Sequence, residues 1–181
     1  MRQTAVKLLT LISLIGIVCP SLCKAADAGW KDVGIRAGIS AKEKHEFFHQ
    51  YEVFTTYGLP WDWRAASGWG VALQINAAAG ALHGGGETGF IGTLGPGIVL
   101  DKAGKGLALD LGPNVCLMSQ RTYGRQDFNG RFLFMAHVGL TYRFDSGPGV
   151  GYRFQHMSNG GIYGGGNPGL DLHMVGLSWN F

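Results

Sequence analysis

The residues best suited to chemistry lie near the C-terminus, in the run QHMSNGG at 155–161. His156 and Ser158 are two residues apart in this run, so on a β-strand their side chains project from the same face. An imidazole can act as general base toward such a hydroxyl, provided that a third group orients the ring. Asp171 begins the next alternating stretch and can supply this carboxylate across a hairpin. The spacing therefore indicates a Ser–His–acid arrangement.

This arrangement falls on the apolar face of its two strands. On the first strand, the residues that share parity with His156 are Val150, Tyr152 and Phe154. On the second, those that share parity with Asp171 are His173, Val175, Leu177, Trp179 and Phe181. The opposite face of the first strand carries Arg153 and Gln155. Because the outer wall of a membrane barrel is apolar, we expect Ser158, His156 and Asp171 to face lipid.

The rest of the chain supplies a frame for these residues. Apolar residues alternate with polar or small ones in stretches of about ten, which is the weak signature of a transmembrane β-barrel. Eight such stretches are expected, at 32–41, 47–58, 68–79, 89–100, 106–119, 132–144, 149–157 and 170–181. Turn residues separate them, among others at 58–60, 102–105, 126–130 and 146–149. Pro96 and Pro113 fall inside two stretches, which requires a bulge or a place near the membrane edge. The pattern predicts an all-β fold, a closed eight-stranded antiparallel transmembrane β-barrel filled by side chains.

The N-terminus reads as an export signal. Arg2 and Lys7 precede a short apolar run, and small residues follow it. We assign residues 1–26 to a signal peptide, with cleavage between 25 and 28, and residues 27–181 to the barrel domain. Removal of the signal peptide lowers the formal net charge from +3 to zero, so nothing favours a nucleic-acid partner. It also leaves Cys116 as the single cysteine, without an intrachain disulfide.

Topology predicts the depth of the site in the membrane. An even number of strands brings both termini to one side, the periplasmic side in outer-membrane barrels. The strand that carries His156 then runs outward, which places the site toward the outer leaflet. The chain ends in an aromatic strand with a terminal Phe181, a feature typical of barrels assembled in the bacterial outer membrane.

The pattern His156-x-Ser158-Asn159, followed by a Gly-rich turn, Asn167 and an acid, resembles the PagL-type lipid A 3-O-deacylases. The resemblance implies an eight-stranded outer-membrane barrel that hydrolyses the ester-linked 3-position acyl chain of lipid A. It assigns Ser158 as nucleophile, His156 as base and Asp171 as the orienting acid. The same resemblance makes the Asn167 side chain and the Gly161 backbone N–H the oxyanion donors. Asn159 is expected to shape the turn.

This chain departs from that family in two ways. Asp171 stands where the usual pattern has Glu, and the turn is one residue longer among its glycines. His173, on the same face, is an alternative partner for the site. The resemblance implies lipid A (lipopolysaccharide) as substrate, outer-membrane lipids as surroundings, and neither cofactor nor metal. A homodimer is left open.

Other functions fit the same sequence. One is an acyltransferase barrel that adds a fatty acid to lipid A. Another is a structural or adhesion barrel without activity, and a soluble lipocalin-like binding barrel is a further one. His45, His49, His83 and His137 are interpreted as surface or lumen residues rather than metal ligands. Trp61, Trp63, Trp69 and Trp179 are interpreted as interfacial anchors. Lys42, Lys44 and Arg64 are interpreted either as contacts to substrate phosphates or as ordinary rim charges.

Overall fold

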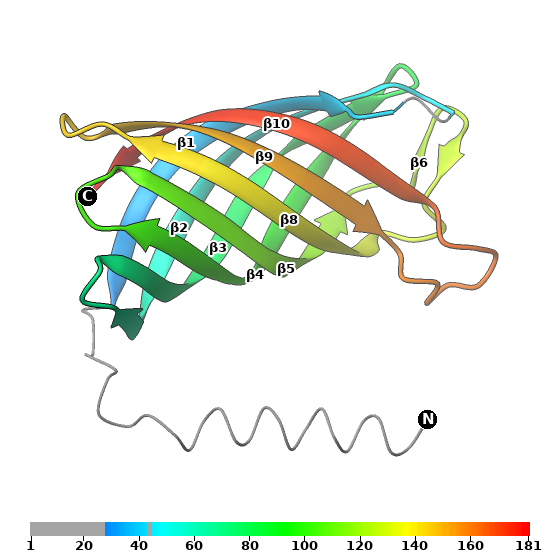
Figure 1. Cartoon of the computed structure of the whole chain (residues 1–181). Coiled ribbons are helices and arrows are strands. Elements are labelled where there is room, and N and C mark those ends of the chain that lie inside the picture. Colours follow the sequence, from blue (N-terminus) through cyan, green and yellow to red (C-terminus); the bar gives the residue numbers. More distant parts are fainter. Residues whose placement is uncertain (1–27, 43–44) are drawn as a thin grey trace, which may run out of the picture.

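The computed structural model describes residues 28–42 and 45–181, and the predicted signal peptide lies outside them. Eight long antiparallel strands close into one barrel in the order β1-β10-β9-β8-β5-β4-β3-β2 (Figure 1). Their bounds are β1 Gly29–Ser40, β2 Phe48–Arg64, β3 Trp69–Gly84, β4 Glu87–Lys102, β5 Leu107–Met118, β8 Phe132–Arg143, β9 Pro148–Ser158 and β10 Gly169–Asn180. Two short strands, β6 Thr122–Tyr123 and β7 Gln126–Asp127, pair with each other. Within the described ranges, no helix is long and apolar enough to cross a membrane.

The predicted eight-stranded closed barrel is confirmed, but two of the predicted turns differ in the structure. Residues 58–60 do not end a strand, because β2 continues through them to Arg64. The pairing of β2 with β3 is irregular between Gly58 and Asp62, so Pro60 lies where no regular ladder bond is needed. The segment 126–130, expected as a turn, contains β7. It belongs to the long connection between β5 and β8.

Pro96 and Pro113 are accommodated without a bulge, which was one of the two arrangements that we expected. The β4–β5 register is the same on both sides of them, Leu94 with Val115 and Ile98 with Leu111. This register sets the two prolines opposite each other, in the part of the ladder where no pairs form. Each proline retains a partner on its other side, in β3 and in β8. Neither proline has a backbone N–H to donate. Because the two prolines face each other, the missing hydrogen bonds all fall in the β4–β5 ladder.

The two ends of the barrel differ, and we name them by their connections. The loop end carries the segments 85–86, 119–131 and 159–168, and the terminal end carries the turns 65–68, 103–106 and 144–147 together with both ends of the barrel domain. Exposed tryptophans gather at the terminal end, as interfacial anchors would. They are Trp30, Trp61, Trp63, Trp69 and Trp179.

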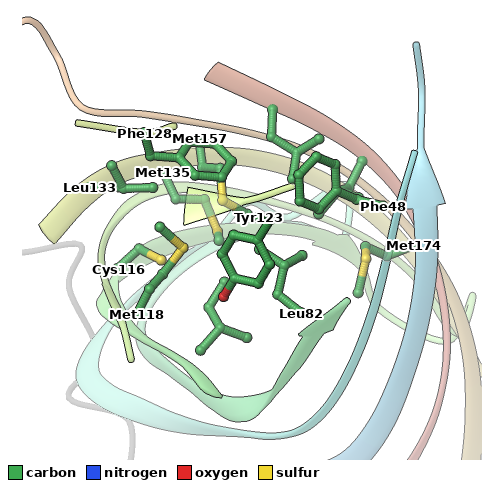
Figure 2. Packing of buried hydrophobic residues seen from close by; sticks show 13 residues of the cluster. Phe48, Leu82, Cys116, Met118, Tyr123, Phe128, Leu133, Met135, Met157 and Met174 are labelled. Carbon is green, nitrogen blue, oxygen red and sulfur yellow. The ribbon is translucent and has the colours of Figure 1, made fainter. Parts of the chain in front are cut away.

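The interior is polar toward the terminal end and apolar at the loop end. In the polar part Arg36 Nε lies 2.6 Å from Glu52 Oε1. Asp110 Oδ2 accepts from Arg153 at 2.7 Å and lies 3.1 Å from His137 Nε2, so His137 is a lumen residue as predicted. At the loop end, Tyr123 and Phe128 of the β5–β8 connection fold inward and are fully buried (Figure 2). They close the apolar cluster over Phe48, Leu82, Met157 and their neighbours.

Candidate active site

Strands β9 and β10 bring His156 and Asp171 together on the outer wall near the loop end. The two residues are direct partners in the β9–β10 register. His156 Nδ1 lies 2.6 Å from Asp171 Oδ1, with the imidazole about half exposed and the carboxylate 29% exposed. When Nδ1–H donates to the carboxylate, Nε2 keeps its lone pair. This is the tautomer that a general base requires.

Ser158 ends β9 on the same face as His156 and is paired with Gly169 across the hairpin. Its residue exposure is only 9%. A Cβ built on Gly169 would lie 3.1 Å from His156 Cε1 and 3.3 Å from Ser158 Cβ. The ring and the serine therefore border one small space, and the absence of a side chain at Gly169 keeps that space open.

The loop after Ser158 is organised by Asn159, which is fully buried. Its Nδ2 donates to the Phe128 carbonyl at 3.0 Å, and its Oδ1 accepts from the Gly161 N–H at 2.7 Å. The expected turn-forming role of Asn159 is thus confirmed. The bond to Asn159 Oδ1 occupies the Gly161 N–H, which we expected to face the substrate. Asn167, the other expected oxyanion donor, is exposed on the loop.

A second attachment of this loop escaped sequence reasoning. The Tyr163 hydroxyl lies 3.2 Å from both the N and the O of Phe132, at the start of β8. Asn129 Nδ2 also donates to the Gly164 carbonyl at 3.5 Å. The segment 128–132 therefore holds the loop at several points. An aromatic residue in a run of glycines was the only local signal for this attachment.

His173 is engaged elsewhere and is not an alternative partner for His156 in this structure. It faces outward one row below Asp171, opposite Phe154. Its Nδ1 lies 2.5 Å from the Tyr152 hydroxyl, and the two rings stack with centroids 5.9 Å apart. Asp171 is thus the carboxylate that contacts His156.

Comparison with known proteins decides the family. Residues 49–180 match the family described as lipid A 3-O-deacylase (PagL). The chain belongs to this family. The match includes the whole of β9, β10 and the loop between them, so the PagL family pattern covers every site residue named above. Membership identifies the protein as an outer-membrane barrel from a family of lipid A hydrolases.

One solved structure supports this fold. The crystal structure of the outer membrane enzyme PagL superposes with a TM-score of 0.72 at 21% identity, covering 83% of this chain and 99% of that one. The outer membrane protein OprG from Pseudomonas aeruginosa matches with a TM-score of 0.34 at 14% identity, covering 87% of this chain and 98% of that one. A search of curated proteins finds no match.

Proposed function

We propose that this PagL family member hydrolyses the ester-linked 3-position acyl chain of lipid A, with Ser158 as nucleophile, His156 as base and Asp171 as orienting acid. The observation that carries the proposal is the 2.6 Å contact between His156 Nδ1 and Asp171 Oδ1 beside Ser158 on the outer wall. Ionisable groups that face a membrane are costly and usually functional. Here the cost is reduced because the groups bind each other near the rim of the barrel.

The reaction follows from these positions. Ser158 Oγ attacks the ester carbonyl while His156 Nε2 takes the hydroxyl proton. The tetrahedral intermediate collapses and the bond between the acyl carbon and the sugar oxygen breaks. His156 returns the proton to that departing oxygen. Water then attacks the acyl-enzyme with His156 again as base, which releases the fatty acid and restores Ser158. Asp171 stays ionised throughout and stabilises the imidazolium.

Asn167 and the Gly161 N–H are the proposed donors to the oxyanion. The exposed Asn167 amide is able to reach a substrate without displacing other protein groups. The Gly161 N–H is released when the Asn159 amide turns away, or it is shared between Asn159 and the substrate oxygen. One oxyanion donor contributes about 10²–10³-fold to kcat in a serine protease. These proposed roles therefore predict a larger loss of kcat for Asn167→Ala than for changes elsewhere on the loop.

The substrate enters sideways from the outer leaflet, with the loop end directed outward and the termini periplasmic. An apolar furrow of about 780 Å³ on the same side of the barrel supports this route. Its exposed side chains come from four neighbouring strands: Ile35, Tyr51, Val53, Val150, Val175 and Leu177. When a lipid presents its ester to Ser158, its acyl chains can pack against this apolar furrow.

Lipid A mass spectrometry tests the proposal. In cells of known lipid A structure that express the protein, the mass of lipid A should fall by that of one 3-hydroxyacyl chain. Ser158→Ala and His156→Ala should abolish this loss apart from a trace, since sites without a triad member retain about 10³–10⁴-fold catalysis over water. Ser146→Ala, in an exposed turn at the terminal end, is the matched control and should keep full activity. Full deacylation by either triad variant would refute the assignment. A gain of mass would show acyl transfer instead.

A further inference from the structure

Two histidines that are 34 positions apart in the sequence become neighbours on the outer wall. His49 is the second residue of β2 and His83 the penultimate residue of β3, and the β2–β3 register pairs them directly. Their ring centroids are 6.3 Å apart with an interplanar angle of 40°. Both side chains share the outward parity of Tyr51, which is 56% exposed. The pair lies at the loop end, separated from β10 by β1, and is therefore distinct from the site on β9 and β10.

The separation of the rings matches the geometry of two imidazoles that share one metal ion. A Zn–N bond is about 2.0–2.1 Å and a ring nitrogen lies roughly 1.1 Å from its ring centre, so centroids are at most about 6.4 Å apart when one ion bridges them. Tetrahedral bonding shortens that distance to about 5 Å. The observed 6.3 Å is just inside the upper limit, and tetrahedral binding requires the two rings to approach each other by about 1 Å.

One of the two rings is already oriented for such binding. His83 Nδ1 lies 2.8 Å from the Thr88 hydroxyl oxygen, on the adjoining strand β4. When Nδ1–H donates to that oxygen, Nε2 carries the free lone pair. Metal-binding histidines usually have their other nitrogen held by such a partner. The ring of His49 is supported from one side by the edge of Phe47, at a centroid distance of 5.2 Å.

The remaining ligand positions are open. Among the residues that the structure describes, no group of three or more His, Cys, Asp or Glu is arranged to hold a metal. Two imidazoles with open positions are unlike the closed four-ligand sites that stabilise small domains. Imidazole favours Zn²⁺, Cu²⁺ and Ni²⁺ over the hard cations Mg²⁺ and Ca²⁺.

We propose that His49 and His83 form a binding site for a divalent transition-metal ion, positioned by Thr88, on the outer rim of the barrel. The bound ion links β2 to β3 beside the two-residue turn between β3 and β4, and water or an anionic group from outside completes its coordination. The site is independent of Ser158, His156 and Asp171. The proposal differs from our interpretation of His49 and His83 as surface or lumen residues rather than metal ligands.

Binding of Zn²⁺ alone tests the proposal on the full barrel in detergent micelles. Isothermal titration should give one saturable site in the wild type. His49→Gln and His83→Gln should each weaken Zn²⁺ binding at least tenfold. Thr88→Val, which keeps the shape but removes the hydroxyl, should weaken it about 10–100-fold, as for other partners of metal-bound histidines. His173→Gln and His45→Gln are the matched controls, and binding should be unchanged in both.

A second measurement on the wild type makes the test independent of variant folding. Zn²⁺ should protect His49 and His83 from acylation by diethyl pyrocarbonate while His45 stays reactive, as read by peptide mass spectrometry. Cu²⁺ bound at the site should show hyperfine coupling to two imidazole nitrogens in its electron paramagnetic resonance spectrum. Absence of saturable Zn²⁺ binding would overturn the proposal. So would a loss of Zn²⁺ binding in His156→Gln together with unchanged binding in His49→Gln. Neither result depends on whether the protein deacylates lipid A.

Discussion

Gly169→Ala tests whether the space between His156 and Ser158 is set by the absence of a side chain. The added methyl carbon would lie 3.0 Å from the Met157 carbonyl oxygen, 3.1 Å from His156 Cε1 and 3.3 Å from Ser158 Cβ. Ordinary contact begins at 3.4 Å, so the imidazole must move by about 0.3 Å. Gly169 is not in the left-handed region of backbone space, so its backbone dihedral angles are compatible with alanine.

The size of the effect follows from how steeply catalysis depends on geometry. A misplacement of about 1 Å in a reactive arrangement costs about 10²-fold in rate. If the free-energy cost scales with displacement, a shift of about 0.3 Å lowers kcat roughly fourfold. Because the methyl group lies between base and nucleophile and not in the furrow for the acyl chain, KM should change little.

A kinetic assay with purified lipid A in mixed micelles measures this effect, with fatty acid release followed by mass spectrometry. Gly29→Ala is the matched control, because a Cβ there meets nothing within 4 Å, and its kcat should equal that of the wild type. The thermal midpoint of Gly169→Ala should stay close to the wild-type value. An unchanged kcat, or a decrease explained wholly by lower thermal stability, would refute the reasoning.

Three further predictions concern the site and the residues that hold it. Asp171→Asn should lower kcat by up to about 10⁴-fold in the deacylation assay, as the equivalent change does in serine proteases, whereas Asp171→Glu should retain most activity. Tyr163→Phe removes the two 3.2 Å contacts to Phe132 and should lower kcat severalfold while Ser158 still reacts with a fluorophosphonate probe; equal loss of labelling would contradict a role confined to the loop. The buried Tyr123 hydroxyl has no hydrogen-bond partner among the described residues, so Tyr123→Phe should leave the unfolding free energy unchanged or higher. Burial raises the pKa of Tyr123 to about 12, so wild-type stability is complete below the unfolded-state pKa of about 10 and falls as pH rises toward 12; denaturant titrations across this range should show a smaller fall in Tyr123→Phe.

Strand parity made much of the site predictable from sequence. Because side chains alternate strictly along a strand, the position of His156 and Asp171 on one face followed from counting alone. The contact between His156 and Asp171 also followed, since a hairpin pairs residues that are nearly adjacent in the chain. Such local rules need no knowledge of distant segments.

The features that sequence reasoning missed depend on pairing between distant segments. Nothing in the run of 159–168 shows that Asn159 will bond to Phe128 or Tyr163 to Phe132. The pairing of His49 with His83 depends on the register of two long strands, and β3 extends five residues beyond the stretch that we expected, which ended at residue 79. Pro60 favours a strand end because proline interrupts ladder hydrogen bonds, yet β2 continues through an irregular segment that contains it.

The location of the site also follows from a reversal of polarity within β9. Toward the terminal end, Arg153 points into the lumen and Tyr152 points to lipid, as in any membrane barrel. Four residues later the apolar Met157 is buried, and the polar His156 lies exposed on the outward face.

The plug formed by the β5–β8 connection explains the reversal. Tyr123 and Phe128 close the loop end of the lumen, so an ionisable side chain directed inward there would meet the apolar cluster without a partner. The same side chain directed outward reaches the rim, where headgroups and water lower its cost. The buried plug and the outward position of His156 are therefore two consequences of one arrangement. Variants that loosen the plug should affect the site through Phe128 and Asn159, even though the plug does not face lipid.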